Sequence, residues 1–107
     1  KVKVVTAPFH DNDRAQAERD TEGFARIVVG PGAKILGAQV VGAGAADLIQ
    51  IVALAMVSKL GLRAFTGVVA PYPTRGEIIK RAAGTFYTPV LFSAGTRRLV
   101  GLLNKLP

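Results

Sequence analysis

The sequence contains no cysteine and no tryptophan, and its only histidine is His10. The absence of cysteine excludes disulfide bonds, thiolate metal sites and cysteine redox chemistry within the chain. One histidine cannot hold a metal ion without several carboxylate helpers, and the nearby Asp11 and Asp13 are more typical of a polar turn. We therefore predict no metal site in this chain.

Long apolar runs and the usual catalytic signatures are also absent. The longest apolar stretch, residues 45–57, is interrupted by Asp47 and Gln50 and is too short to span a bilayer. The sequence has no phosphate-binding loop with lysine, no G-x-S-x-G elbow and no H-E-x-x-H. A nucleophile–base pair is missing as well, so the chain by itself is not expected to be an enzyme.

Acidic residues are scarce in the C-terminal third. Residues 75–107 carry six basic groups and one acidic group, Glu77, whereas residues 1–22 carry four basic and five acidic groups. The formal net charge of +7 raises the question of a nucleic-acid partner. No zinc-finger, KH or RRM signature and no row of aromatic residues accompanies this charge, so we predict a solvated basic face or one that meets an acidic domain. A nucleic-acid-binding module, or a peripheral membrane module whose last helix lies on anionic lipid, is kept as an alternative.

The length of 107 residues and the apolar content of 50% predict one folded domain over residues 1–107. The first residue is lysine rather than methionine, so we expect a C-terminal fragment of a longer chain, with any targeting signal upstream.

The residue patterns predict an α+β fold in which an antiparallel β-sheet with a central hairpin packs against helices. Alternation predicts a strand over 1–6, and Asn12 or Asp13 is expected to cap one or two helical turns. A hairpin follows, with arms at 24–29 and 34–41. Apolar residues on both faces of its first arm predict a sheet covered at least partly on both sides.

The helix predicted over residues 45–60 is apolar nearly all round, with Gly61 as its C-cap. One stripe contains Leu48, Ile49, Val52 and Met56, and a second contains Ile51, Leu54 and Ala55. A helix that is apolar on two faces is expected to be buried on two faces. Because a domain of this size has one core, the second face is predicted to meet another subunit or domain.

The C-terminal part is predicted to be helical after a connector over residues 62–70. One helix is expected from Pro73 or Thr74 to about Phe86, with Thr88-Pro89 as its break, and an amphipathic helix over 93–105 follows. The first of these helices is predicted to direct Lys80 outward and four apolar residues inward: Ile78, Ile79, Ala82 and Ala83.

The stretch A-P-Y-P-T-R-G-E, residues 70–77, is where chemistry is most expected. Two prolines flank Tyr72 and hold the backbone extended, so the direction of the ring is fixed. Thr74 and Glu77 have the T-x-x-E spacing of a capping box. Local spacing alone favours a capped helix start with Tyr72 packed on the core, and the alternative is a tyrosine presented to a neighbour's cleft.

The stretch Gly42-Ala43-Gly44 has the strand, G-x-G, helix order of half a dinucleotide fingerprint. Asp47 occupies the third glycine or alanine position, and its charge opposes a pyrophosphate at the helix N-terminus. The preceding strand also belongs to a hairpin rather than a βαβ unit. We therefore predict a tight strand-to-helix turn without a cofactor, in which Asp47 favours the helix dipole.

The order of these motifs resembles that of a known family. The chain reads D-N-D-R-A-Q-A-E, E-G-F-A-R-I-V-V, G-A-K-I-L-G-A-Q-V-V-G, A-D-L-I-Q and A-P-Y-P-T-R-G-E. It resembles, over essentially its whole length, the C-terminal dimerisation domain of the pyridine nucleotide–disulfide oxidoreductases, which include dihydrolipoamide dehydrogenase, glutathione reductase and mercuric reductase. The resemblance implies a cytoplasmic homodimer and a parent enzyme that reduces a disulfide or a metal ion. FAD and NAD(P)H would be bound by other domains of that parent chain and not by this one.

In this family each dimerisation domain lends residues to the other subunit's active site, through a stretch that typically reads H-x-H-P-T-x-x-E. Here Ala70 and Tyr72 stand at the two histidines, while Pro73, Thr74 and Glu77 match. A histidine titrates near pH ~6.5 and a tyrosine near ~10, so Tyr72 cannot be a resting base at neutral pH.

The resemblance nevertheless places Tyr72 near the partner's redox site, where it could donate a hydrogen bond or hold a substrate or metal ion. It implies Glu77 as a weaker catalytic candidate with a capping role, and it puts Pro71 at the edge of the partner's flavin. A tyrosine at this position is typical of the mercuric reductase branch, but that branch carries a cysteine pair near its C-terminus that is absent here. The dimer interface is predicted to contain Leu48, Ile51, Val52, Leu54, Ala55 and Pro73.

Overall fold

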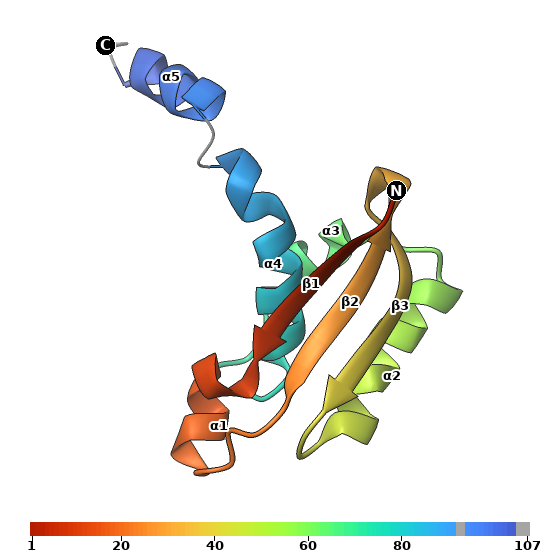
Figure 1. Ribbon diagram of the computed structural model, residues 1–107. Coiled ribbons are helices and arrows are strands. Elements are labelled where there is room, and N and C mark those ends of the chain that lie inside the picture. The colour runs from red at the N-terminus through yellow and green to blue at the C-terminus, as the bar shows by residue number, and fades with distance from the viewer. Residues whose placement is uncertain (92–93, 105–107) are drawn as a thin grey trace.

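The computed structural model describes residues 1–91 and 94–104 (Figure 1). Within these residues, three strands and five α-helices follow one another, together with two short 3-10 turns. In order they are β1 (Lys3–Pro8), η1 (Phe9–Asp11), α1 (Asp13–Ala17), β2 (Phe24–Gly30), η2 (Pro31–Ala33), β3 (Lys34–Val41), α2 (Ala45–Val57), α3 (Arg63–Gly67), α4 (Glu77–Leu91) and α5 (Ala94–Leu103).

The strands form one antiparallel sheet in the order β1-β2-β3, with Val5 opposite Ile27 and Ala7 opposite Ala25. Successive side chains of a strand point to opposite faces, so every second residue enters the core. The strand residues buried on this inner face are Val5, Ala7, Ala25, Ile27, Val29 and Ile35. The α+β prediction and the predicted hairpin are confirmed.

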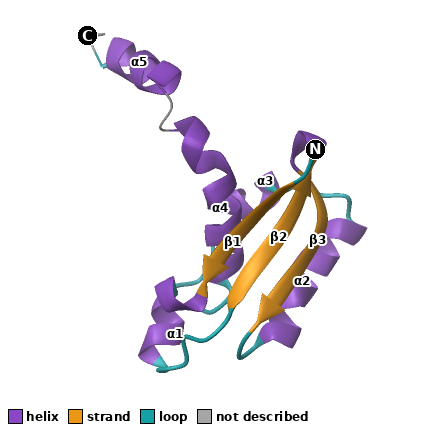
Figure 2. Ribbon diagram, viewed as in Figure 1, coloured by secondary structure: helices purple, strands orange, loops and turns teal. Residues whose placement is uncertain are grey.

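Helices cover the inner face of the sheet (Figures 1 and 2). Helix α4 packs against β1 and β2, α2 packs against β3, and α3 packs against α4. The four inward residues predicted for α4 are all buried, and Lys80 is exposed, as predicted.

The outer face of the sheet is open within the described chain. Val4 and Leu36 are 55% and 43% exposed, and Val28 is half-buried. The guanidinium carbon of Arg26 lies 4.6 Å from the centre of the Phe24 ring on this face. The part of the chain that the structure describes therefore covers one of the two apolar faces that the strand pattern contains and leaves the other open.

Two glycines make the turn from β3 into α2, as predicted. Gly42 and Gly44 have φ values of 133° and 77°, a region that side chains other than glycine rarely adopt. A β-carbon on Gly42 would also lie 2.8 Å from the Glu22 carbonyl oxygen. Asp47 lies in the first turn of α2, where its charge favours the helix dipole.

The predicted bounds of three elements are wrong. Helix α2 ends at Val57 rather than at residue 60, because Lys59, and not the predicted C-cap Gly61, adopts the left-handed conformation (φ 58°) that ends a helix. Helix α4 begins at Glu77 and continues through Pro89 to Leu91, since a helix can tolerate the loss of one hydrogen bond by bending. The first strand spans 3–8 rather than 1–6.

Helix α5 extends away from the sheet beyond α4 (Figure 1). Leu99, Leu102 and Leu103 are 57%, 62% and 53% exposed, and none of the α5 side chains that the structure describes is buried. The first and last residues of the amphipathic helix predicted over 93–105 lie outside the described residues.

A chain that ends at Leu91 is expected to keep its stability, because α5 supplies no described residue to the core. The free energy of unfolding should change by less than about 0.5 kcal/mol, the usual range for changes away from packed groups. Urea unfolding of the two chains measures this, and a loss above about 2 kcal/mol would show that α5 packs on the domain.

Candidate functional site

Tyr72 is 70% exposed, so it does not pack on the core. The Tyr72–Pro73 peptide bond is cis. The capping box forms only by half, because the Thr74 backbone N–H donates to Glu77 Oε2 at 3.1 Å while the Thr74 hydroxyl donates to the Pro71 carbonyl at 2.8 Å. Glu77 thus has the capping role that was predicted for it, and Tyr72 is presented outward.

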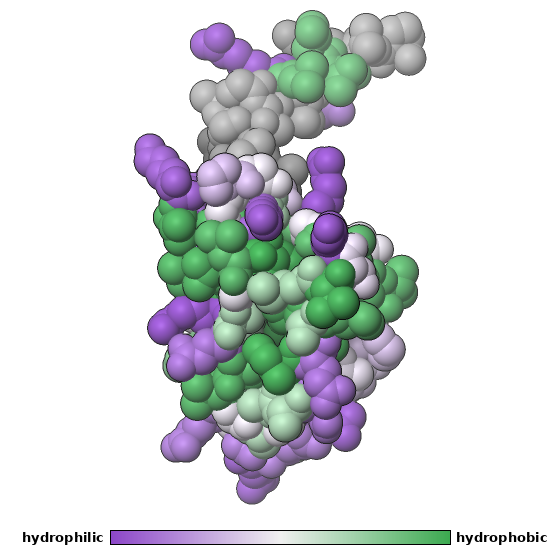
Figure 3. Space-filling view, turned by 90° about the vertical axis from the view of Figure 1, so that its right-hand side faces the viewer, coloured by the Kyte–Doolittle hydropathy of each residue, from purple (hydrophilic) through white to green (hydrophobic). Residues whose placement is uncertain are grey.

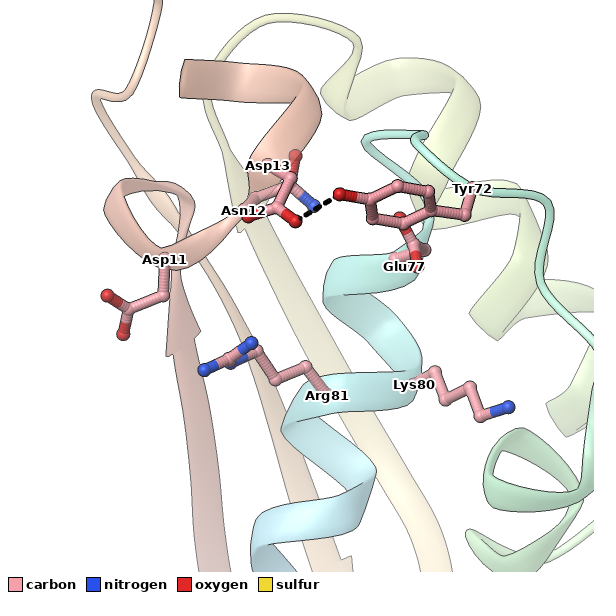
Figure 4. Close-up of a pocket in the computed structure, with 7 residues that line it drawn as sticks. All are labelled: Asp11, Asn12, Asp13, Tyr72, Glu77, Lys80 and Arg81. Atoms are coloured by element: carbon pink, nitrogen blue, oxygen red, sulfur yellow. Dashed lines mark hydrogen bonds between the residues drawn. The ribbon is translucent and has the colours of Figure 1, made fainter. Parts of the chain in front are cut away.

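Three consecutive residues at the start of α1 hold this stretch from the side. Asn12 Nδ2 donates to the Thr74 carbonyl at 3.1 Å, and Arg14 Nη1 donates to the Pro73 carbonyl at 3.3 Å. Between them, the Tyr72 hydroxyl donates to Asp13 Oδ2 at 2.5 Å (Figure 4). We call residues 12–14 the α1 clamp.

The α1 clamp is itself fixed by helix capping. Asn12 is buried, with 5% exposure, and its Oδ1 accepts the Ala15 backbone N–H at 2.9 Å as the N-cap of α1. A buried amide that satisfies both a helix start and a distant carbonyl has little freedom to move. The prediction of a cap at Asn12 or Asp13 is confirmed for Asn12.

Arg75 anchors the end of the same stretch. Its side chain is 12% exposed, and Nε and Nη1 donate to the carbonyls of Ala43 and Asp20 at 2.9 and 3.0 Å. The guanidinium carbon lies 4.1 Å from the centre of the Phe9 ring, and Nη1 lies 3.6 Å from Glu18 Oε1. One side chain therefore ties the loop to the turn before α2, to the segment after α1 and to the core.

Charged groups surround the tyrosine in an open pocket of about 270 Å³ (Figure 4). The hydrogen bond to Asp13 and the negative charge of that carboxylate raise the pKa of Tyr72 above its ordinary value, with a smaller contribution from Glu77. Lys80 does not approach the hydroxyl through its ammonium, which donates to the Val68 carbonyl at 2.6 Å. The pocket is lined by Asp11, Asn12, Asp13, Tyr72, Glu77, Lys80 and Arg81.

Residues 1–91 and 94–104 contain no cluster of three or more His, Cys, Asp or Glu side chains that could hold a metal ion. Arg75 lies against the G-x-G turn, with Cδ 3.9 Å from where a β-carbon of Gly44 would stand, and it bonds the Ala43 carbonyl. No described helix is long and apolar enough to cross a membrane.

The α2 residues predicted for the interface differ in how far this chain buries them. Leu48, Val52 and Ala55 are 8%, 1% and 4% exposed, so they belong to this chain's own core rather than to an open face of the helix. Ile51 and Leu54 are 43% and 68% exposed. The helix does have two apolar faces, but the division of its residues between them differs from the predicted stripes.

The open face of α2 continues onto the loop that leads to Tyr72. Val68 and Val69 are 52% and 92% exposed, and Ile51, Val68 and Pro71 line one apolar hollow of about 150 Å³. Figure 3 looks onto this side of the molecule and shows hydrophobic side chains gathered across its middle. We call Ile51, Leu54, Val68 and Val69 the α2 surface.

Comparison with known proteins gives the family. A sequence model of the pyridine nucleotide-disulphide oxidoreductase dimerisation domain matches residues 1–83. The chain belongs to this family. This chain is 37% identical over 84 residues to dihydrolipoyl dehydrogenase of Corynebacterium glutamicum. The aligned segment covers 78% of this chain and 18% of that protein. It is 39% identical over 74 residues to mercuric reductase of Shigella flexneri, covering 68% of this chain and 13% of that protein.

Solved structures agree with the fold of the dimerisation domain. LpdA from Mycobacterium tuberculosis matches with a TM-score of 0.74 and 24% identity, over 79% of this chain and 19% of LpdA. RclA from Escherichia coli, a flavoprotein disulfide reductase, also matches with a TM-score of 0.74 and 24% identity, over 78% of this chain and 20% of RclA. The chain thus spans about a fifth of the length of the relatives it matches.

Sequence reasoning missed the residues that hold Tyr72 in place. The sequence predicts Asp13 only as part of a polar turn or as a helix cap, and it predicts no role for Arg75, although Asp13 bonds Tyr72 and Arg75 ties the Tyr72 stretch to Ala43. The contacts of the α1 clamp join residues 59 to 62 positions apart, and no local pattern contains such pairs. The available signal was the D-N-D-R sequence itself, which is richer in charge than a simple turn needs.

Proposed function

We propose that two copies of this chain pair through the α2 surface, in the homodimer of a longer FAD- and NAD(P)H-dependent disulfide or metal oxidoreductase. The family supports the pairing, and the apolar residues of the α2 surface support its location. Exposed apolar patches of this kind mark interaction sites in soluble proteins. Pro71, which lines the same hollow as Ile51 and Val68, would lie at the edge of the interface toward the partner's flavin, and the exposed Pro73 two residues later would meet the partner as well.

We also propose that Tyr72 enters the redox site of the other subunit. The observation that carries this proposal is that Tyr72 is 70% exposed and yet held by a hydrogen bond of 2.5 Å to Asp13. An exposed side chain is normally mobile, and a group that acts on a substrate must be held in position. Glu77, whose carboxylate caps α4, would act through its charge alone.

The open outer face of the sheet would be covered by the cofactor-binding domains of the same parent chain. The relatives are about five times as long as the segment that this chain matches, so they have chain enough to form such domains. Val4 and Leu36 would become buried in that contact.

Replacement of Tyr72 by phenylalanine in the flavoenzyme that contains this chain tests the catalytic proposal. Loss of one functional hydrogen bond is expected to lower kcat/KM for the disulfide or metal substrate about 10-fold, with the fold unchanged. Tyr87→Phe is the matched control, because it removes one hydroxyl from a half-buried ring that packs edge-on against Phe86. Equal turnover of the Tyr72→Phe variant and the wild type would leave Tyr72 without a catalytic role.

A further inference from the structure

The one proton of the Tyr72 hydroxyl is already committed within this chain. The hydroxyl donates to Asp13 Oδ2 at 2.5 Å, and an ionised carboxylate can only accept. A phenol has one O–H hydrogen, so the lone pairs of its oxygen are what it offers to a second group. This reverses the simplest expectation for a tyrosine, which is that it donates toward a substrate.

The carboxylate is held in place to receive this proton. Asn12 and Arg14, on either side of Asp13, donate to the carbonyls of Thr74 and Pro73, the two residues that follow Tyr72. Each of three successive residues of the α1 clamp thus contacts one of three successive residues of the loop. Such matched contacts fix the position of Asp13 relative to the tyrosine more firmly than one exposed hydrogen bond would.

Glu77 does not compete for this role. Its Oε2 accepts the Thr74 backbone N–H at 3.1 Å, so its carboxylate is occupied by the helix cap. The other charged groups around Tyr72 are Asp11 on η1, Arg14 on α1, and Lys80 and Arg81 on α4. Of these, Lys80 is bonded to the Val68 carbonyl and Arg14 to the Pro73 carbonyl.

We infer that Asp13 is the positioning residue of Tyr72, and that the Tyr72 oxygen faces the partner subunit's site as a hydrogen-bond acceptor for a thiol S–H. This inference rests on the proposed function, which brings the tyrosine to the redox site of a disulfide oxidoreductase, because reduction of a disulfide yields thiols. The carboxylate polarises the phenol and makes its oxygen a better acceptor. It does not take the thiol proton through the phenol, because a carboxylate holds a proton far less tightly than a thiol does.

Titration of Tyr72 tests the positioning role without any activity measurement. The chain has two tyrosines, so a Tyr87→Phe background leaves Tyr72 as the only source of tyrosinate absorbance. In this background the titration midpoint is expected above the ordinary ~10, and Asp13→Asn should bring it back toward that value. Asp47→Asn is the matched control, because Asp47 also lies in the first turn of a helix and is not among the groups that raise the pKa of Tyr72. An unchanged midpoint in Asp13→Asn overturns the inference.

The same variants are expected to differ in how their free energy of unfolding depends on pH. Since the pKa of Tyr72 is raised on folding, the folded chain binds this proton more tightly than the unfolded chain. The stabilisation is complete below the unfolded pKa of ~10 and is lost as the pH rises through the higher folded value. The stability difference between the Tyr87→Phe chain and its Asp13→Asn variant should therefore shrink at alkaline pH, while the Asp47→Asn variant should show no such trend.

Activity of the parent flavoenzyme tests the acceptor role. Asp13→Ala frees the Tyr72 proton and should lower kcat/KM about 10-fold, as Tyr72→Phe does, and Asp13→Asn should lie between because its amide oxygen still accepts. The double variant Asp13→Ala/Tyr72→Phe should be no worse than Tyr72→Phe alone, and additive losses would overturn the acceptor role. If Tyr72→Phe has no effect on turnover, the proposed function fails, while the titration still decides whether Asp13 holds the phenol.

Discussion

Leu54→Asp is expected to convert the dimer of this chain into a monomer. Leu54 is 68% exposed on α2 and lies in the α2 surface, where the proposal places the partner. In a two-fold interface the substitution occurs twice, and each copy buries a carboxylate among apolar side chains with no partner of opposite charge. We expect the dissociation constant to rise by at least about 100-fold, the usual cost of losing a central interface residue.

Sedimentation equilibrium across a concentration series measures this change, with Val4→Asp as the matched control. Val4 is 55% exposed and also aliphatic, but it lies on the outer face of the sheet. Both variants expose the same new charge, so a difference between them reports the location of the interface. A Leu54→Asp chain that still dimerises like the wild type, or a Val4→Asp chain that dissociates equally, would contradict pairing through α2.

The sheet and α4 could be predicted because their side-chain patterns have a period. Ala25, Ile27 and Val29 alternate with outward residues, and the inward residues of α4 recur at helical spacing. The turn at Gly42 was predictable as well, because glycine tolerates the backbone that a tight strand-to-helix turn needs.

The faces of α2 could not be predicted, because a helix that is apolar all round contains no polar stripe to orient it. Leu54 and Ala55 are adjacent, but the smaller residue is buried and the larger one exposed. Only the packing of α2 against β3 decides this, and that packing depends on residues elsewhere in the chain. The contacts between Tyr72 and Asp13, and between Arg75 and Ala43, could not be predicted from local sequence patterns either, because each joins segments more than 30 residues apart.

Arg75→Ala is expected to be the most destabilising of the substitutions around the site. The side chain makes two hydrogen bonds from a charged donor, worth about 1.5–3 kcal/mol each, and a contact with the Phe9 ring worth about 1 kcal/mol. Against these, its buried Nη2 finds no hydrogen-bond partner in the described part of the chain, which costs about 1–3 kcal/mol. The balance predicts a loss of about 3 kcal/mol in the free energy of unfolding, or roughly 15 °C in melting temperature for a domain of this size.

Arg75→Lys and Arg63→Ala separate the possible causes of that loss. Lysine keeps the charge but lacks the planar fork, so it can reach one of the two carbonyls and should lose about half as much stability. Arg63 is exposed at the start of α3, and its removal should change stability by less than about 0.5 kcal/mol. If Arg75→Ala were as stable as Arg63→Ala, the bonds of Arg75 to Ala43 and Asp20 would contribute nothing to the fold.

The Arg75 variants also connect stability to the site. Arg75 and the α1 clamp both hold residues 72–75, and Arg75 and Arg14 share the Glu18 carboxylate, so loosening Arg75 should weaken the bond between Tyr72 and Asp13. In the Tyr87→Phe background, the Tyr72 titration midpoint of Arg75→Lys should then move toward ~10 while the chain remains folded. A midpoint that stays raised in Arg75→Lys would show that the α1 clamp is sufficient to hold the tyrosine, and that Arg75 serves the fold alone.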